Sequence, residues 1–375
     1  MNRENKMVRL REQYRRIRLK VPFFALLVFV LTAVSLILHI LFYVSTAFAD
    51  GFNQTVSALL REMLSCVSRV FPFSLAELLI LLLIPLLICA LIYAYRLQDS
   101  VRLTRFTCLV LSFLFLIYCL FVLTFASGYR GKTLDEKMGL DRQEVTEKEL
   151  FETGLWLVSK LEQLEGQVMY DAEGASVMPI SFDEMTRELC LSYHDLRRDY
   201  RFIPYSSGRA KPVAMSKMMS HTQILGVYTF FTGEANVNTN FNDFCTVFTA
   251  AHEMAHQRGF AKEDEANMMA FLACRNSRIP YIQYAGNFEM LRYVLSALAS
   301  ANSPYYTELW LRTPESARGD QAVYAARFAP YRDSVVGSIS GAVNDTFLKL
   351  QGTVGRKSYG LVVDLAVALY RAQGD

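Results

Sequence analysis

Residues 249–259 read Thr-Ala-Ala-His-Glu-Met-Ala-His-Gln-Arg-Gly and contain the pattern His-Glu-x-x-His. On an α-helix, His252 and His256 lie four residues apart on one face, so both imidazoles can bind one zinc ion. Glu253 projects beside them, toward the position that a water molecule takes on such an ion. The segment therefore predicts a helix that binds zinc. The alternative interpretation is a surface helix with incidental histidines.

Glycine and polar residues mark the expected ends of this helix. Asn242 or Asp243 can cap its start, and Gly259 is placed to end it. Arg258 is unusual at its position, because the corresponding residue of zinc-binding helices of this kind is more often apolar.

The segment after the expected helix contains three carboxylates that can supply a third ligand. If a second helix begins near Lys262, Glu263 and Asn267 lie on the same face, one turn apart. Glu263 can then reach the metal, while Asn267 orients one of the imidazoles. Glu265 would point away from that face, so we rank Glu263 first, Glu265 second and Asp264 third. An acidic helix start that complements the helix dipole is the alternative interpretation of all three.

The two motifs together resemble the gluzincin clan of metallopeptidases. In that clan, His-Glu-x-x-His is followed by Glu-x-x-x-Asp or a related motif whose glutamate is the third zinc ligand. The resemblance implies that Glu263 is the ligand and that Asn267 stands in place of the commoner aspartate. The connection from His256 to Glu263 is much shorter than in typical gluzincins.

Three longer stretches are similar to an uncharacterised bacterial membrane family, which is catalogued only as a domain of unknown function. They are residues 231–238, 251–267 and 343–365. The similarity covers most of the chain after Tyr129. It implies a zincin-like fold but no substrate.

The composition of the chain indicates a membrane region joined to a polar domain. The 375 residues are 52% hydrophobic and 20% charged, which is too apolar for a disordered or purely soluble protein and too charged for one buried entirely in lipid. Charge-free runs are concentrated before residue 130, and each is long enough to cross a bilayer. We expect transmembrane helices at about 21–49, 74–95 and 106–129, and an amphipathic helix near 52–70.

The distribution of basic residues predicts the orientation of these spans. Residues 1–20 hold eight Lys and Arg against two Glu, which gives a basic tail of charge +6. Between the second and third spans, Arg96, Arg102 and Arg105 outnumber Asp99. Because short cytoplasmic segments carry the excess of Lys and Arg, we place the tail and this loop in the cytoplasm. With three crossings, residues 130–375 form an extracytoplasmic domain.

The domain at 130–375 is expected to be α+β and mostly helical, with a zincin-like fold. A helix is predicted at 181–200, a hairpin at 227–238, and helices from Asn242 almost to the end of the chain. The hairpin directly precedes the His-Glu-x-x-His segment. It is expected either to bind an extended peptide along its edge or to support the helix from inside.

Single cysteines and histidines outside the motif are interpreted as structural. The domain contains Cys190, Cys245 and Cys274, which we expect to be small buried residues, although a Cys245–Cys274 disulfide stays open. His39, inside the first span, is expected to be neutral and to bind a neighbouring helix.

These features predict a multi-pass protein of the cell membrane that acts as a zinc-dependent hydrolase, most plausibly a metallopeptidase. Zn²⁺ bound by His252, His256 and Glu263 would activate a water molecule, and Glu253 would act as the general base. The expected partners are a peptide or protein substrate outside the cytoplasm and the lipid bilayer, without nucleic acid. The alternatives are a catalytically inactive metal-binding receptor or scaffold, and a transporter-like or structural protein with an incidental motif.

Overall fold

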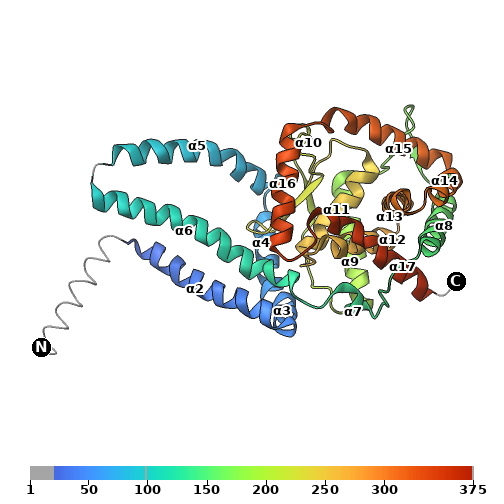
Figure 1. Cartoon of the computed structure of the whole chain (residues 1–375). Helices are drawn as coiled ribbons and strands as arrows, with labels where there is room; N and C mark the ends of the chain where they lie inside the picture. The colour runs from blue at the N-terminus through green and yellow to red at the C-terminus, as the bar shows by residue number, and fades with distance from the viewer. Residues whose placement is uncertain (1–20, 98, 374–375) are drawn as a thin grey trace, which may run out of the picture.

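Three long apolar helices extend together from one side of a larger domain (Figure 1). The computed structural model describes residues 21–97 and 99–373. The helices are α2 (Phe23–Val44), α5 (Leu75–Arg96) and α6 (Ser100–Thr124), and each is long and apolar enough to cross a membrane. The expectation of three apolar helices before the domain is therefore confirmed. The basic tail predicted at residues 1–20 lies outside the described residues.

The ends of two of these helices differ from the sequence-based limits. The first apolar run, predicted as one span over 21–49, is divided at Ser45, which has extended backbone dihedrals. The hydroxyl oxygen of Ser45 accepts a hydrogen bond from the amide of Phe48 and so begins a separate helix, α3 (Thr46–Phe52). The third helix begins six residues before the predicted 106, because Asp99 caps its first turn.

The segment between α3 and α5 buries its polar side chains and exposes its apolar ones. It consists of a π-helical turn, η1 (Asn53–Ser57), and α4 (Ala58–Ser68). The buried side chains of α4 are all polar, and they are Arg61, Ser65 and Ser68. Large apolar side chains of the same helix are exposed, and they are Leu59, Met63 and Val67. The helix predicted near 52–70 is thus present, and its contact with a membrane stays a prediction.

The single histidine of α2 binds a neighbouring helix. Nδ1 of His39 lies 2.9 Å from the hydroxyl oxygen of Tyr118 on α6, and the ring also contacts those of Tyr43 and Phe121. This hydrogen bond satisfies a polar group within the apolar segment, as the sequence interpretation expected.

The domain is built mainly from helices packed around α13 (Pro280–Ala301). This helix contacts α8, α11 and α12, and its buried residues form the middle of the hydrophobic core. The described helices of the domain are η2 (Ala126–Tyr129), α7 (Leu134–Met138), α8 (Glu147–Leu164), α9 (Phe182–Asp199), α10 (Ser216–Ser220), α11 (Asp243–Gln257), α12 (Glu263–Arg275), α13, α14 (Ser303–Arg312), α15 (Glu315–Phe328), η3 (Ala329–Tyr331), α16 (Val335–Leu350), η4 (Gly355–Leu361) and α17 (Val362–Gln373). The prediction of a mostly helical architecture is confirmed, including the helix expected at 181–200.

The strands are short and lie in two small sheets. Strands β1 (Met169–Tyr170) and β2 (Ser176–Val177) form an antiparallel pair. The second sheet has the order β3-β5-β4, in which β5 (Glu234–Val237) pairs antiparallel with β4 (Gly226–Thr229) and parallel with β3 (Ala210–Pro212). The predicted hairpin is therefore formed, with β4 at the edge of the sheet.

The hairpin sheet is tied to the end of α5 by a buried carboxylate. Glu234 accepts hydrogen bonds from the amides of Leu75 and Ala76, in the first turn of α5. The ammonium of Lys211 lies 2.6 Å from a carboxylate oxygen of Glu234. A carboxylate at a helix N-terminus is favourable because it complements the dipole, so this contact fixes the sheet against the apolar helix.

The cysteines of the domain lie in the core. Cys190, Cys245 and Cys274 are buried and none of them forms a disulfide. Burial raises the pKa of the Cys245 thiol to about 12. These residues act as small core side chains, as expected.

Candidate metal centre

The His-Glu-x-x-His segment lies on α11, as predicted, and nearly every side chain of that helix is buried. The helix ends at Gln257 and the chain then turns sharply at Gly259, which has a φ of +94°. A side chain at this position would also collide with the guanidinium of Arg61, since an added Cβ would lie 2.4 Å from Nη2. Glycine is therefore required there for two reasons: the backbone has a positive φ, and there is no space for a Cβ atom.

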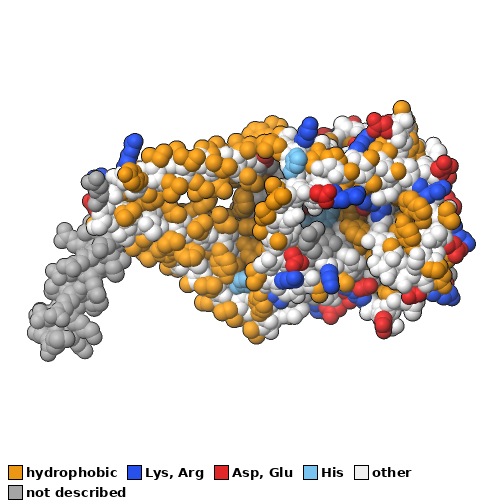
Figure 2. Space-filling view, turned by 45° about the horizontal axis from the view of Figure 1, so that its top comes forward, with side chains coloured by type: hydrophobic (Ala, Val, Ile, Leu, Met, Phe, Trp, Pro, Cys, Tyr) orange, Lys and Arg blue, Asp and Glu red, His pale blue; other side chains and the backbone are white. Residues whose placement is uncertain are grey.

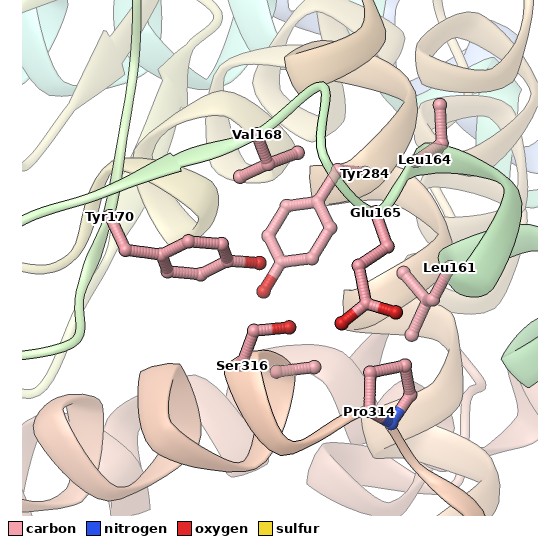
Figure 3. A pocket seen from close by; sticks show the side chains of 9 residues that line it. Leu161, Leu164, Glu165, Val168, Tyr170, Tyr284, Pro314 and Ser316 are labelled. Carbon is pink, nitrogen blue, oxygen red and sulfur yellow. The ribbon is translucent and has the colours of Figure 1, made fainter.

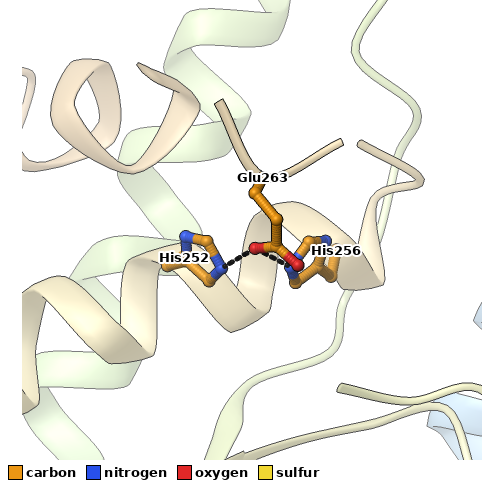
Figure 4. Close-up of side chains that lie close together, drawn as sticks. All are labelled: His252, His256 and Glu263. Atoms are coloured by element: carbon orange, nitrogen blue, oxygen red, sulfur yellow. Dashed lines mark ion pairs between the residues drawn. The ribbon is translucent and has the colours of Figure 1, made fainter. Parts of the chain in front are cut away.

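The turn brings α12 back over α11 and places Glu263 opposite both histidines (Figure 4). One carboxylate oxygen, Oε2, lies 3.2 Å from Nε2 of His252 and 3.5 Å from Nε2 of His256. Ligand atoms around one tetrahedral zinc ion are about 3.3 Å apart, given zinc–ligand distances near 2.0–2.1 Å. Within the described part of the chain, this is the one group of three such side chains close enough to share an ion.

Both imidazoles are oriented by hydrogen bonds from their other ring nitrogen. Nδ1 of His252 lies 2.7 Å from Oδ1 of Asn267, and Nδ1 of His256 lies 2.6 Å from the backbone oxygen of Phe260. Because each acceptor takes the Nδ1 proton, Nε2 of each ring faces Glu263 and is the nitrogen that can bind a metal once the ring is neutral. This arrangement is the one that metal-binding histidines require.

Glu253 lies between α11 and the edge strand. Its Oε1 atom is so close to Gly226 that a Cβ added at that glycine would lie 2.6 Å away. The carboxylate accepts a hydrogen bond from the backbone of Tyr228, whereas its Oε2 atom is buried without a hydrogen-bond partner among the described residues. Burial raises the pKa of Glu253, and the nearby His252 and His256 oppose this only in part.

The other two candidate ligands have different partners. Oε1 of Glu265 accepts hydrogen bonds from the amide of Leu134 and from the ammonium of Lys262. Asp264 pairs with Arg142 at 3.2 Å. Neither carboxylate belongs to the three-residue group, so the geometry favours Glu263, the first of the ranked candidates.

The histidines and Glu263 are strongly coupled electrostatically. Burial lowers the pKa of His256, but the charge of Glu263 and its hydrogen bond outweigh burial and raise that pKa to about 9. For Glu263, burial alone would raise the pKa. The two histidines outweigh burial and hold the pKa of Glu263 well below its ordinary value. A carboxylate that stays ionised next to two imidazoles is suited to bind a divalent cation.

The buried polar atoms of this group also fit a metal ion. Oε2 of Glu263 is buried with only the two imidazoles as partners, and Oε2 of Glu253 is buried without a hydrogen-bond partner among the described residues. Buried polar atoms without such partners are uncommon in folded proteins and require an explanation, such as a bound ion. Two imidazole nitrogens and one carboxylate oxygen are the donor set of many zinc sites.

Arg61 of α4 connects the membrane region to the C-terminal end of α11. Its guanidinium donates to the backbone oxygens of Thr124 and Arg258, which are at the C-terminal ends of α6 and α11, and to the side chain of Asn53. Burial lowers its pKa to about 10, so Arg61 stays charged at neutral pH. Two helix C-termini therefore stabilise this buried cation.

Several supporting residues could not be recognised from the sequence. Arg61 and Gly226 act across long sequence separations, and only the folded chain brings them to α11. Arg258, which appeared anomalous, is buried with its guanidinium 4.2 Å from the ring centroid of Tyr193 and donates to the backbone oxygen of Met254. Asn242 occupies the N-cap position of α11, as expected, but its side chain donates to Asp320 and makes no cap hydrogen bond. Asp243 is the first residue of the helix and accepts from the amide of Met178.

A small cavity elsewhere in the domain is not connected with these residues (Figure 3). It lies beside Tyr170, Tyr284 and Ser316 and has a volume of about 10 Å³. That volume holds about one water molecule, so the cavity is too small for a substrate.

Comparison with known proteins places the chain in a family. A family model described as "Protein of unknown function (DUF3810)" matches residues 48–367. The chain belongs to the DUF3810 family. Neither the curated proteins nor the solved structures that were searched gave a match.

The DUF3810 match covers more than the His-Glu-x-x-His segment. It includes α5 and α6 together with the domain from η2 into α17. Two of the three apolar helices and the group of His252, His256 and Glu263 thus belong to one family unit. The family assignment agrees with the sequence resemblance to an uncharacterised membrane family.

Proposed function

We propose that this protein is a membrane-anchored zinc-dependent hydrolase and, specifically, a metallopeptidase. The observation that carries the proposal is the convergence of His252 Nε2, His256 Nε2 and Glu263 Oε2. Both Nδ1 atoms are hydrogen-bonded to the protein, which orients the two rings. We infer that the domain is zincin-like, since a metal-binding helix, a following helix with the third ligand and an adjacent edge strand occur together.

The residues of the chain fit a general-base mechanism. When bound, zinc polarises a carbonyl group and lowers the pKa of water. His252, His256 and Glu263 hold the ion, and Glu253 accepts the proton of the attacking water and then delivers it to the leaving amine. The raised pKa of Glu253 favours this role, because a base that must also release its proton works best with a pKa near the working pH.

The edge strand offers a place for an extended substrate. β4 is the last strand in the order β3-β5-β4, and its Gly226 lies against Glu253. A peptide that pairs with β4 would therefore pass the general base. The alternative, that the hairpin only supports α11 from inside, is consistent with the contacts of β5 on that helix.

The proposed orientation places the domain outside the cytoplasm. Arg96 and Arg102 lie at the connection between α5 and α6, at the end of the helices opposite the domain (Figure 1). An excess of basic residues marks the cytoplasmic side of short loops. The substrate would then be an extracytoplasmic peptide or protein.

The test is a Glu253→Gln variant of the full chain in detergent, assayed with a broad peptide library. We expect the variant to keep its zinc and to lose activity by about 10²- to 10⁴-fold. Unchanged activity would overturn the role of Glu253. A parent protein that binds zinc but cleaves no peptide would favour the inactive receptor or scaffold instead.

A further inference from the structure

Helix α16 carries a stripe of large apolar side chains that the described protein does not cover. The exposed fraction is 73% for Val335, 61% for Ile339, 65% for Val343 and 70% for Leu350. These residues recur at three- and four-residue spacing, so they share one face of the helix. The complete stripe, which we call the α16 stripe, consists of Val335, Val336, Ile339, Val343, Phe347 and Leu350.

The opposite side of α16 is fixed to the domain. Gly337 and Leu348 are its buried residues, and a Cβ at Gly337 would lie 2.7 Å from the side chain of Gln223. The hydroxyl of Ser334 donates to the backbone oxygen of His221 at 2.6 Å. The helix is therefore held in place through its other face, and the stripe is directed away from the domain.

The α16 stripe continues the apolar surface of the membrane-spanning helices. The ring of Phe347 lies 6.0 Å from that of Phe121 on α6 and 6.3 Å from that of Tyr129, just beyond the end of α6. In Figure 2, hydrophobic side chains cover the spans and continue onto the adjoining part of the domain, whereas charged side chains are spread over the domain.

Helix α4 offers a second exposed apolar face at the same end of the spans (Figure 1). Leu59, Met63 and Val67 are exposed there, while Arg61 and Ser65 are buried against the protein. A helix that buries its polar residues and exposes its apolar ones is suited to a lipid environment on its outer side.

We propose that α16 lies in the outer boundary of the bilayer, at the same end of the spans as α4, with the α16 stripe in contact with acyl chains. Lipid is the partner that fits, because the stripe adjoins a span and is matched by a second apolar face on a separate helix at that same level. Lys349, paired with Asp345 at the edge of the stripe, can extend its ammonium toward the headgroups. This lipid contact does not depend on the proposed hydrolase activity.

The test uses tryptophan fluorescence of the full chain in liposomes of phosphatidylcholine brominated near the top of its acyl chains. Ile339→Trp and Val343→Trp report the α16 stripe, and two positions serve as controls. Ser338→Trp lies on an exposed polar part of α16, and Leu311→Trp is an exposed apolar site on α14, at the far end of the domain. The parent, with its two natural tryptophans, supplies the background.

We expect the added emission of both stripe variants to fall about twofold or more in brominated lipid, since interfacial helices bury their apolar face by about 5–10 Å. The two control variants should lose little emission. If neither stripe variant is quenched more than Leu311→Trp, the proposal is overturned. Blue-shifted but unquenched emission from both stripe variants would also overturn it, because a second protein copy would then cover the stripe.

Discussion

Oδ1 of Asn267 lies 2.7 Å from Nδ1 of His252 and fixes the ring of this candidate ligand. Asn267 is on α12, one turn after Glu263, so a single helix supplies both a candidate ligand and the residue that orients another candidate ligand. The two elements α11 and α12 thus form the centre together, and a change in one alters the geometry of the other.

This relationship predicts the effect of Asn267→Ala. The variant leaves the Nδ1 proton of His252 without its acceptor, and we expect the zinc affinity to fall by about 10- to 100-fold. Asn267→Asp is the matched control, because it keeps an acceptor oxygen and should retain most of the affinity. Competition titration with a fluorescent chelator measures both. Equal affinity in Asn267→Ala and the parent would contradict the orienting role.

The pH dependence of zinc binding tests the coupling between His256 and Glu263. The imidazole must lose its proton to bind zinc, and the pKa of His256 is about 9 in the metal-free protein. We therefore expect the apparent affinity to keep rising from neutral pH to about pH 9 and then to level. In Glu263→Gln the main charge that raises this pKa is lost, so the rise should end nearer the ordinary imidazole value of about 6.5.

The same chelator titration, repeated across this pH range, measures the position of the plateau. Glu263→Gln will also bind zinc more weakly overall, since a ligand is altered, but only the pH at which the affinity levels is compared. An identical pH profile in the variant and the parent would show that Glu263 does not control the protonation of His256.

The buried contacts of Arg61 predict an effect on stability. Arg61→Met removes the cation that joins Thr124, Arg258 and Asn53, and leaves their buried oxygens without this donor. We expect a loss of about 2–4 kcal/mol in the free energy of unfolding. Arg69→Met on the exposed surface of the same region is the control and should cost less than about 0.5 kcal/mol. Denaturant unfolding in detergent measures both, and equal stability of the two variants would contradict this account.

The close approach of Gly226 to Glu253 predicts that a side chain at position 226 lowers catalytic turnover without loss of metal. A Cβ in Gly226→Ala would lie 2.6 Å from Oε1 of Glu253, so the carboxylate must move. Because a displacement of about 1 Å in a reacting group can cost roughly 100-fold, we expect kcat to fall on that order while zinc is retained. Val227→Ala, an exposed neighbour on the opposite face of β4, should change kcat little. A peptidase assay with metal analysis checks this, and parent-like turnover of Gly226→Ala would exclude a fixed general base at Glu253.

Local sequence patterns predicted the parts of the fold that depend on short-range physics. The apolar runs predict three long helices, and the Gly233-Glu234 pair predicts the hairpin that β4 and β5 form. The spacing of His252 and His256 places both rings on one helical face. The position of Glu263 relative to Asn267 ranks it above Glu265, and the folded chain brings Glu263 to the histidines.

Features that hydropathy and residue spacing do not encode could not be predicted in this way. The break at Ser45 depends on a local cap inside a run that is uniformly apolar, so hydropathy alone does not reveal it. Strand β3 lies in a turn-rich stretch and forms only by pairing with β5. In the sequence, Arg61 is an ordinary charge of an amphipathic helix. It is buried because the C-terminal ends of α6 and α11, which are distant from it in the sequence, lie against it in the fold.

The most direct test of the metal centre is the zinc content of the full chain purified without chelator, compared between Glu263→Gln and Asp264→Asn. The two carboxylates are adjacent, but only Glu263 contacts the histidines, since Asp264 pairs with Arg142. We predict about one zinc ion per chain in the parent and in Asp264→Asn, and clearly less in Glu263→Gln. A parent without bound metal, or a Glu263→Gln variant with as much zinc as Asp264→Asn, would contradict the assignment of this site.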